Sequence, residues 1–246
     1  MERVYSPDGP IDGQILLKKD EAHHLIKVRR CRSGDSVVAF NGRGEAWHCL
    51  VMDHDRQSVV LRVTGVVARQ DPEPRKKLII ATAVPKGERF DWLIEKATEL
   101  GVSELVPLHC ERSVVEPRDS KLDRLRRHVI EACKQCGRND LMEIGSPLDL
   151  KQLSERFDSE SELLWADQGG EPVSRVVTSQ SLAQVSNYVV CIGPEGGWSL
   201  TERDWFAMKN WRKIGLGPYI LRIETAGVVA SSALFQVFMA SGFQGE

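Results

Sequence analysis

The spacing of hydrophobic positions along the chain changes once, near residue 75. Before that point, short runs of alternating or β-branched apolar residues predict strands. These predicted strands cover residues 15–17, 37–40, 46–52 and 59–67. Residues 41–44 (Asn-Gly-Arg-Gly) supply a turn between the second and third strands. Several short strands in the first 70 residues predict a small β-barrel.

One helix interrupts these strands. Asp20 is expected as its N-cap, and Ala22, Leu25 and Ile26 follow at helical spacing. After the last strand, the Asp-Pro-Glu-Pro run at residues 71–74 breaks any regular structure. We therefore place a linker between two domains at this run.

From residue 77 onward, strand patterns alternate with helix patterns. Apolar strands are predicted at residues 78–84, 105–108, 163–166 and 188–192, and helices at residues 88–100, 120–136 and 225–241. Ser199 and Glu202 form a capping box for a further helix. The last helix is apolar nearly all round, which predicts burial on more than one side. This alternation predicts a parallel sheet with helices on both faces.

Two stretches near the C-terminus carry most of the chemical information. Residues 191–199 and 216–226 each read as the end of an apolar strand, a Gly/Pro turn and the start of a helix. Junctions of this kind gather at the carboxyl edge of a parallel sheet, where open α/β folds bind ligands. The glycines of the first turn allow a ligand to approach the backbone closely. The two turns together predict one pocket, although the first turn alone is equally consistent with a plain tight turn.

The known phosphate-binding motifs are missing from these turns. No GxGxxG run follows the first strand of the second region, and no Gly-Lys-Ser/Thr run is present. This argues against an enzyme that binds a dinucleotide or a nucleoside triphosphate. Arg222 and Glu224 stand between apolar residues, where charges are costly to bury without a partner or a role. The second turn therefore favours a functional interpretation.

Composition and cysteine usage are typical of a cytoplasmic protein. The chain has 246 residues, 41% of them hydrophobic, and its first residues are too polar for a signal peptide. Six cysteines at irregular spacing indicate reduced thiols rather than a disulfide framework. Cys133 and Cys136 stand alone within a helical pattern, and His23 and His24 lack further ligands at metal spacing. We expect no metal site.

Charge is distributed unevenly although the net charge is only −2. Residues 140–204 hold twelve acids and four bases, whereas residues 112–138 hold eight bases and four acids. A second basic group comprises Lys27, Arg29, Arg30 and Arg32. Local basic faces on a nearly neutral protein fit a partner that is held at defined places, such as folded RNA. Solvated helix faces would explain the same charges.

Several ordered motifs resemble one known family. They cover Arg3-Val4-Tyr5 and residues 23–29, 86–102, 111–115, 131–139, 192–199 and 216–226. This order is similar to that of the RsmE-type family, which methylates N3 of a uridine in the small-subunit (16S) ribosomal RNA. The resemblance covers essentially the whole chain. It departs from the family pattern at Trp198, where a smaller apolar residue is common, and at Gly227, which interrupts the aliphatic start of the last helix.

The resemblance implies a fold, a cofactor and partners. The expected fold is α/β, with a PUA-like RNA-binding β-barrel over residues 1–70 and a SPOUT parallel-sheet methyltransferase domain over residues 75–246. The C-terminal segment of that domain is expected to form a deep trefoil knot. The implied cofactor is S-adenosylmethionine, and the implied partners are 16S ribosomal RNA, free or in the assembled small subunit, and a second copy of the chain. The implied location is the cytoplasm.

The resemblance and the two turns together nominate site residues. The expected cofactor-binding residues are Ala166, Asp167, Ile192, Gly193, Pro194, Glu195, Gly196, Gly197, Leu216, Gly217, Ile220, Leu221, Arg222, Thr225 and Ala226. Arg222 is the candidate for stabilising charge on the uracil, and Glu195 and Glu224 are candidate proton acceptors that could equally be structural. The expected RNA-binding residues are Arg3, Lys27, Arg29, Arg30, Arg112 and Arg138.

Three other functions stay open at this point. A non-catalytic RNA-binding module would need only the barrel and the basic faces. A nucleotide-dependent enzyme would use the same sheet edge, although the missing phosphate motifs count against it. Within the methyltransferases, transfer to a ribose 2′-oxygen is the alternative, because related knotted enzymes carry it out.

Overall fold

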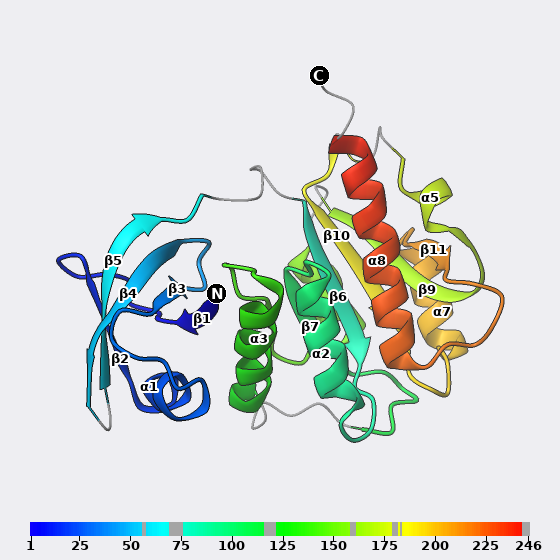
Figure 1. Cartoon of the computed structure of the whole chain (residues 1–246). Helices are drawn as coiled ribbons and strands as arrows, with labels where there is room; N and C mark the ends of the chain where they lie inside the picture. The colour runs from blue at the N-terminus through cyan, green and yellow to red at the C-terminus, as the bar shows by residue number, and fades with distance from the viewer. Residues whose placement is uncertain are drawn as a thin grey trace. The chain divides into compact units, whose positions relative to one another are not determined.

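The chain divides into two compact units. The computed structural model describes residues 1–55, 58–68, 76–115, 122–157, 161–178, 182 and 184–242 (Figure 1). The first unit comprises Met1–Glu73 together with Ile130–Leu141, and the second comprises Pro74–Val129 and Met142–Glu246. The predicted linker at residues 71–74 lies outside the described residues.

The first unit contains a five-stranded sheet in the order β1-β3-β4-β5-β2. Its strands are β1 (Glu2–Tyr5), β2 (Gln14–Lys18), β3 (Ser36–Phe40), β4 (Ala46–His54) and β5 (Ser58–Val66). β1 pairs with β3 in parallel, and the other pairs are antiparallel. The four strands predicted here are confirmed. β1 was not predicted, because it has only one fully buried residue, Val4, and therefore no apolar pattern.

The predicted helix in this unit starts differently from the expectation. α1 (Lys19–His23) continues into one π-helical turn, η1 (His24–Val28), which buries Leu25. The N-cap prediction for Asp20 is wrong: the N-cap is Lys18, and no side chain caps the helix. The reason is that β2 runs directly into α1, so the last extended residue before the helix is the end of the strand itself.

The second unit contains a six-stranded parallel sheet in the order β11-β9-β10-β6-β7-β8. Its strands are β6 (Lys77–Ala83), β7 (Glu104–Leu108), β8 (Glu143–Ile144), β9 (Ser161–Pro172), β10 (Asn187–Ile192) and β11 (Arg212–Gly215). Its helices are α2 (Arg89–Glu99), α3 (Leu122–Cys136), α4 (Leu150–Arg156), α5 (Val173–Val176), α7 (Leu200–Met208) and α8 (Ile223–Gly242). The C-terminal part of α3 belongs to the first unit. The predicted strands and helices are confirmed within one or two residues at most ends, except β9, which is longer.

Helices cover both faces of this sheet, as predicted. Trp165 in β9 stacks on Phe206 of α7 with ring centroids 4.8 Å apart. Tyr188 in β10 contacts Phe238 of α8 at 4.9 Å. Cys191 is the register partner of Trp165 and lies three residues after Tyr188, so the two aromatic residues point to opposite faces. α7 and α8 therefore lie on opposite sides of the sheet, and α8 runs beside α2 (Figure 1).

β9 and β11 approach each other unusually closely. A Cβ atom added to Gly170 would lie 2.3 Å from the carbonyl carbon of Ile214, and one added to Gly215 would lie 2.3 Å from the carbonyl oxygen of Gly170. The register between the two strands shifts at the same place. β8 and β11 could not be predicted because each has only one fully buried residue, and α4 and α5 because helices of seven and four residues are too short to show a helical period. β9 was also predicted to end too early, at residue 166, because the strand continues through polar residues and glycines.

Within one chain, the fully buried residues of α8 lie on one face of the helix. The predicted burial on more than one side is therefore not observed in a single copy. Phe235 and Met239 on the same helix are exposed to 38% and 45%. Residues 223–240 are long and apolar enough to cross a membrane by length and composition, a test that the core helix of a soluble protein also passes. The packing of α8 on β6, β10 and α2 accounts for its apolar character.

Candidate functional site

The first of the two C-terminal turns follows a fully buried strand. β10 ends at Ile192, and Gly197 N–H donates to the carbonyl oxygen of Pro194 at 2.8 Å, which closes the turn. Ser199 and Glu202 then form the predicted capping box at the start of α7. The other Glu202 carboxylate oxygen accepts the backbone N–H of Glu111 at 3.0 Å. The buried Glu202 side chain thus connects this turn to the loop after β7.

The second turn joins β11 to α8 at the same sheet edge. Ile192 is the register partner of Ala166, so the carboxyl end of β10 lies beside the part of β9 that carries Asp167. β11 pairs with β9 on the other side. The Asp167 carboxylate is mostly buried and lies 3.3 Å from Arg203 and 3.7 Å from Lys213. Three segments that are distant in sequence therefore converge at one place.

These segments enclose a cavity of about 280 Å³. Thirteen of the fifteen residues predicted to bind the cofactor line it: Ala166, Asp167, Ile192, Gly193, Pro194, Glu195, Gly196, Gly197, Leu216, Gly217, Ile220, Leu221 and Ala226. The other two, Arg222 and Thr225, are exposed and do not line it. The lining also includes residues that the sequence analysis did not select, namely Gln168, Trp198, Arg203, Tyr219 and Ile223.

Glycine occupies different positions of the cavity lining for different physical reasons. A Cβ atom on Gly193 would lie 2.8 Å from the ring of the buried Trp198. Gly197 and Gly217 have φ angles of +69° and +137°, and an added Cβ atom would meet nothing within 4 Å. Gly193 is therefore required by packing. Gly197 and Gly217 instead leave backbone open at the cavity, which suits close approach of a ligand.

A small cluster of charges lies beside this cavity. Arg89 Nη1 is 2.9 Å from Glu195 Oε1 and 3.9 Å from Glu224 Oε1. Glu224 is buried, and its Oε2 has no hydrogen-bond partner. Arg222 forms no ion pair with any of the acids that the structure describes. Arg89 is not among the predicted site residues, because its contacts with Glu195 and Glu224 span more than 100 residues of sequence.

The predicted RNA-binding residues separate into engaged and exposed side chains. Arg3 is half-buried, bonds to the Arg138 carbonyl oxygen and Asn139 Oδ1, and lies over the Phe40 ring. Burial lowers the pKa of Arg3 below its usual value. The Arg138 side chain is 9% exposed and pairs with Asp140 at 2.9 Å. These two side chains present little area to a ligand.

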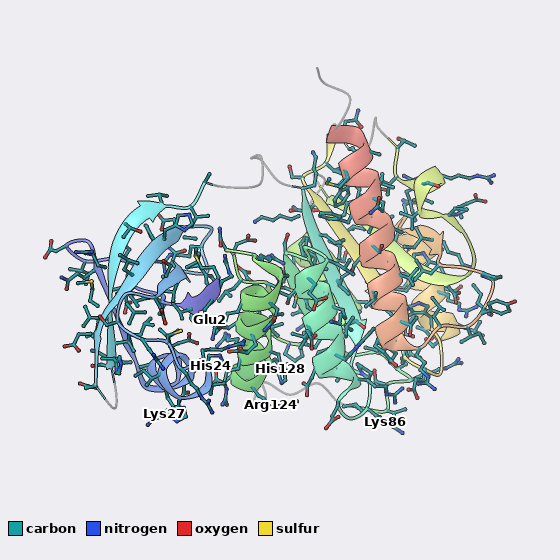
Figure 2. All side chains as sticks on the ribbon, in the orientation of Figure 1. Glu2, His24, Lys27, Lys86, Arg124 and His128 are labelled. Carbon is teal, nitrogen blue, oxygen red and sulfur yellow. The ribbon has the colours of Figure 1, made fainter. Side chains whose placement is uncertain are left out.

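The other predicted RNA-binding side chains are exposed. Arg29 pairs with Glu2 at 2.9 Å, close to His24 (Figure 2), and the side chains of Lys27 and Arg30 are exposed. Arg112 donates to the carbonyl oxygen of Gly196 at 3.1 Å, at the first turn of the cavity. Figure 2 also labels Arg124 and His128 of α3, which both face Asp91 of α2.

The cysteines do not form a metal centre among the described residues. No group of three or more His, Cys, Asp or Glu side chains suited to a metal ion occurs in that part of the chain. Cys133 is buried, which raises its pKa to about 12, and its thiol contacts the carbonyl oxygen of Asp140. Cys136, one helical turn later, is exposed. Cys133 and Cys136 are therefore ordinary residues of α3.

Comparison with known proteins gives consistent matches over most of the chain. The family model for an RNA methyltransferase domain matches residues 71–235, and that for an RNA methyltransferase PUA domain matches residues 17–64. The chain is 31% identical to the ribosomal RNA small subunit methyltransferase E of Synechocystis, over 92% of this chain and 74% of that protein. It is 30% identical to the Bacillus subtilis protein of the same name, over 92% and 91%.

A solved structure shows the same architecture. A protein from Legionella pneumophila, described as a methyltransferase and solved with the bound cofactor S-adenosylmethionine, superposes with a TM-score of 0.83. It is 28% identical in sequence, and the match covers 97% of each chain.

Proposed function

The chain belongs to the ribosomal RNA small subunit methyltransferase E family, and on that premise we propose that it methylates N3 of a uridine in 16S ribosomal RNA with S-adenosylmethionine as the methyl donor. The observation that carries the proposal is the convergence of β9 and the two C-terminal turns on one cavity. The Legionella relative with bound S-adenosylmethionine supports the choice of cofactor.

The residues of the cavity fit this cofactor. Its volume of about 280 Å³ is close to that of typical small-molecule sites. Ile192, Leu216 and Ile220 offer an apolar surface for an adenine ring, and the backbone at Gly197 and Gly217 is open. The free Oε2 of Glu224 is a buried acceptor one residue from the cavity lining. We propose the fifteen residues named above as the cofactor site.

The reaction forms a bond between N3 of the uracil and a methyl carbon. When bound, S-adenosylmethionine supplies this methyl on a sulfonium, whose carbon–sulfur bond breaks as the new bond forms. The enzyme contributes mainly by holding two reactants in line. The base must be presented unpaired, because N3–H is otherwise hydrogen-bonded in a duplex. Glu224 or Glu195 is proposed to accept the N3 proton, and Arg222 to stabilise negative charge on the uracil oxygens.

The two units divide the work in this proposal. We propose that residues 1–70, which share a compact unit with Ile130–Leu141, act as the PUA-like RNA-binding barrel, and that residues 75–246 act as the SPOUT methyltransferase domain. We propose that the C-terminal segment of this domain is threaded into a deep trefoil knot. This is supported by the position of β11 beside β9 rather than beside β10, which precedes it in the chain, and by the backbone contact of Gly215 with Gly170.

We further propose that the protein acts as a cytoplasmic homodimer. The exposed Phe235 and Met239 and a second cavity of about 370 Å³ between α5 and α8 leave apolar surface that a second copy would cover. Sedimentation equilibrium tests this proposal. A monomer at micromolar concentration would contradict it.

Mapping of modified nucleosides tests the function itself. Undermethylated 16S ribosomal RNA, free or in assembled small subunits, is incubated with the protein and labelled S-adenosylmethionine, digested and analysed by mass spectrometry. We expect N3-methyluridine at one site. Methylation on a ribose 2′-oxygen, or no transfer to either substrate, would refute the proposal.

A further inference from the structure

Arg89 lies where the chain leaves the centre of the parallel sheet. It is the first residue of α2 and follows the turn after β6, which is the neighbour of β10. Thr82 in β6 is the register partner of Ile192, so the turn after β6 emerges beside the first turn of the cavity. Arg89 Nε donates to the carbonyl oxygen of Lys86 at 3.2 Å. This bond orients the guanidinium.

The guanidinium faces one carboxylate from the first turn and one from the start of α8. Nη1 donates to Glu195 Oε1 at 2.9 Å and lies 3.9 Å from Glu224 Oε1. Glu195 belongs to the first turn, and Glu224 to the first turn of α8, directly after the second. The Glu195 side chain is 41% exposed, whereas that of Glu224 is 9% exposed. A single cation thus bridges the first turn, where Glu195 lines the cavity, and the start of α8, where the neighbouring Ile223 lines it.

α8 packs closely on α2 near this bridge. A Cβ atom added to Gly227 would lie 2.8 Å from Cδ1 of Leu93. One helical turn earlier on the two helices lie Glu224 and Arg89. A larger residue at Gly227 would require the Leu93 side chain to move, because an added Cβ atom meets side-chain atoms of Leu93. This gives a physical reason for the glycine that interrupts the aliphatic start of α8.

The charges show why the arginine is needed. Without Arg89, the two carboxylates that lie 2.9 and 3.9 Å from its Nη1 would lose their shared cation, and one of them is buried with an unpartnered oxygen. Like charges this close repel, and a buried charge without a partner is strongly disfavoured. We infer that Arg89 is a positioning residue, which holds the two cofactor turns together through Glu195 and Glu224 and so sets the affinity for the cofactor. This inference rests on the proposed function.

Binding of S-adenosylhomocysteine by calorimetry tests the inference. Arg89→Met keeps the aliphatic stem but removes the charge and the donors, whereas Arg89→Lys keeps the charge. We expect Arg89→Met to raise the Kd at least about tenfold, equivalent to about 1.4 kcal/mol, and Arg89→Lys to restore at least about a third of the affinity. The matched control is Lys96→Ala, which breaks ion pairs with Glu95 and Glu99 on the same helix and should leave the Kd within about twofold.

Two further measurements separate positioning from general stability. In methylation assays, Arg89→Met should raise the KM for S-adenosylmethionine about tenfold while kcat falls less than about threefold. In a Glu195→Gln background, the effect of Arg89→Met on the Kd should shrink below about threefold, because the two residues act through one contact. If Arg89→Met does not fold, Glu195→Gln alone tests the same bridge, because it removes the partner charge of Arg89 at an exposed position.

The outcomes are distinct. A wild-type Kd in Arg89→Met, a full effect that persists in the Glu195→Gln background, or an equal loss in Arg89→Lys would overturn the inference while leaving the proposed function intact. A wild-type chain that does not bind S-adenosylhomocysteine would refute the proposed function, and with it this inference.

Discussion

The indole Nε1 of Trp198 donates a hydrogen bond to the carbonyl oxygen of Ala166 at 2.9 Å. This bond ties the turn after β10 to the neighbouring strand β9, at the edge where the cavity lies. The same ring occupies the space that a Cβ atom on Gly193 would need. Packing against Trp198, which departs from the family pattern, thus explains why the first residue of the turn is glycine. The later glycines are explained instead by the open backbone that they leave at the cavity.

The close approach of β9 and β11 predicts a strong effect of a single methyl group. Gly215→Ala would place Cβ 2.3 Å from the carbonyl oxygen of Gly170, an atom of the backbone that no side-chain rotation can move. We expect a loss of roughly 3 kcal/mol in the free energy of unfolding, and hence a fall of about 6–12 °C in Tm. Thermal unfolding followed by circular dichroism measures it.

Gly65→Ala in β5 is the control for this prediction. An added Cβ there meets no atom within 4 Å, and the φ angle lies outside the left-handed region. Its Tm should stay within about 2 °C of the wild type. Equal Tm values for the two variants would show that β9 and β11 separate without cost.

The sequence predicted the elements of this fold where hydrophobic patterns were long. Apolar residues at regular spacing predicted the strands β6 and β10 and the helices α2 and α8. The Ser199–Glu202 capping box was visible because its two members are three residues apart. β11 was not visible, because four residues with one fully buried side chain carry no period.

The site could be predicted only in part, for a different reason. Both turns were found because Gly and Pro mark them locally, and thirteen of the predicted residues do line the cavity. Arg89 was missed because its partners are Glu195 and Glu224, 106 residues away in the first case. Contacts of this length depend on strand order, and a single sequence does not reveal strand order.

The cofactor turn is tested directly by Gly196→Val. A Cβ atom at this position would lie 3.2 Å from Cβ of Arg112, and the two further methyls of valine would meet Arg112 or enter the cavity. We expect at least about tenfold weaker binding of S-adenosylhomocysteine in a folded variant, measured by calorimetry. If Arg112→Gly, which removes that Cβ atom, restored full affinity to Gly196→Val, the valine would act through the loop after β7 and not through the cavity.

The exposed arginines of the first unit are expected to contact RNA phosphates. Arg29 is partly neutralised by Glu2, whereas Arg30 is exposed. Replacing both by Ala should weaken binding of the substrate RNA and lower the slope of log K against log salt by about one to two, with cofactor affinity unchanged. Filter binding at several salt concentrations measures this slope. Arg62→Ala, on the exposed side of β5, is the control, and an unchanged slope in the double variant would contradict the assignment.

The last prediction concerns Arg222, the residue proposed to stabilise the developing charge on the uracil. Its neighbours Leu221 and Ile223 both line the cavity, while its own side chain is exposed. Glu224, the acid nearest in sequence, lies 3.9 Å from Arg89 instead. A guanidinium that is not committed to an ion pair with a described acid is available to a substrate, and a base docked over the cavity would shield it from water and strengthen its field.

Arg222→Ala should therefore affect the chemical step more than binding. Loss of one preorganised charge interaction typically costs about 3 kcal/mol of transition-state stabilisation, or about a hundredfold in rate. Single-turnover methylation at saturating RNA and cofactor measures this step, and the affinities for both should change less than about threefold. Arg212→Ala, which removes an ion pair with Glu162 between β11 and β9, controls for a general loss of charge in the domain. Near wild-type methylation by a folded Arg222→Ala variant would assign this arginine a structural role and leave the stabilisation of the uracil oxygens to another group.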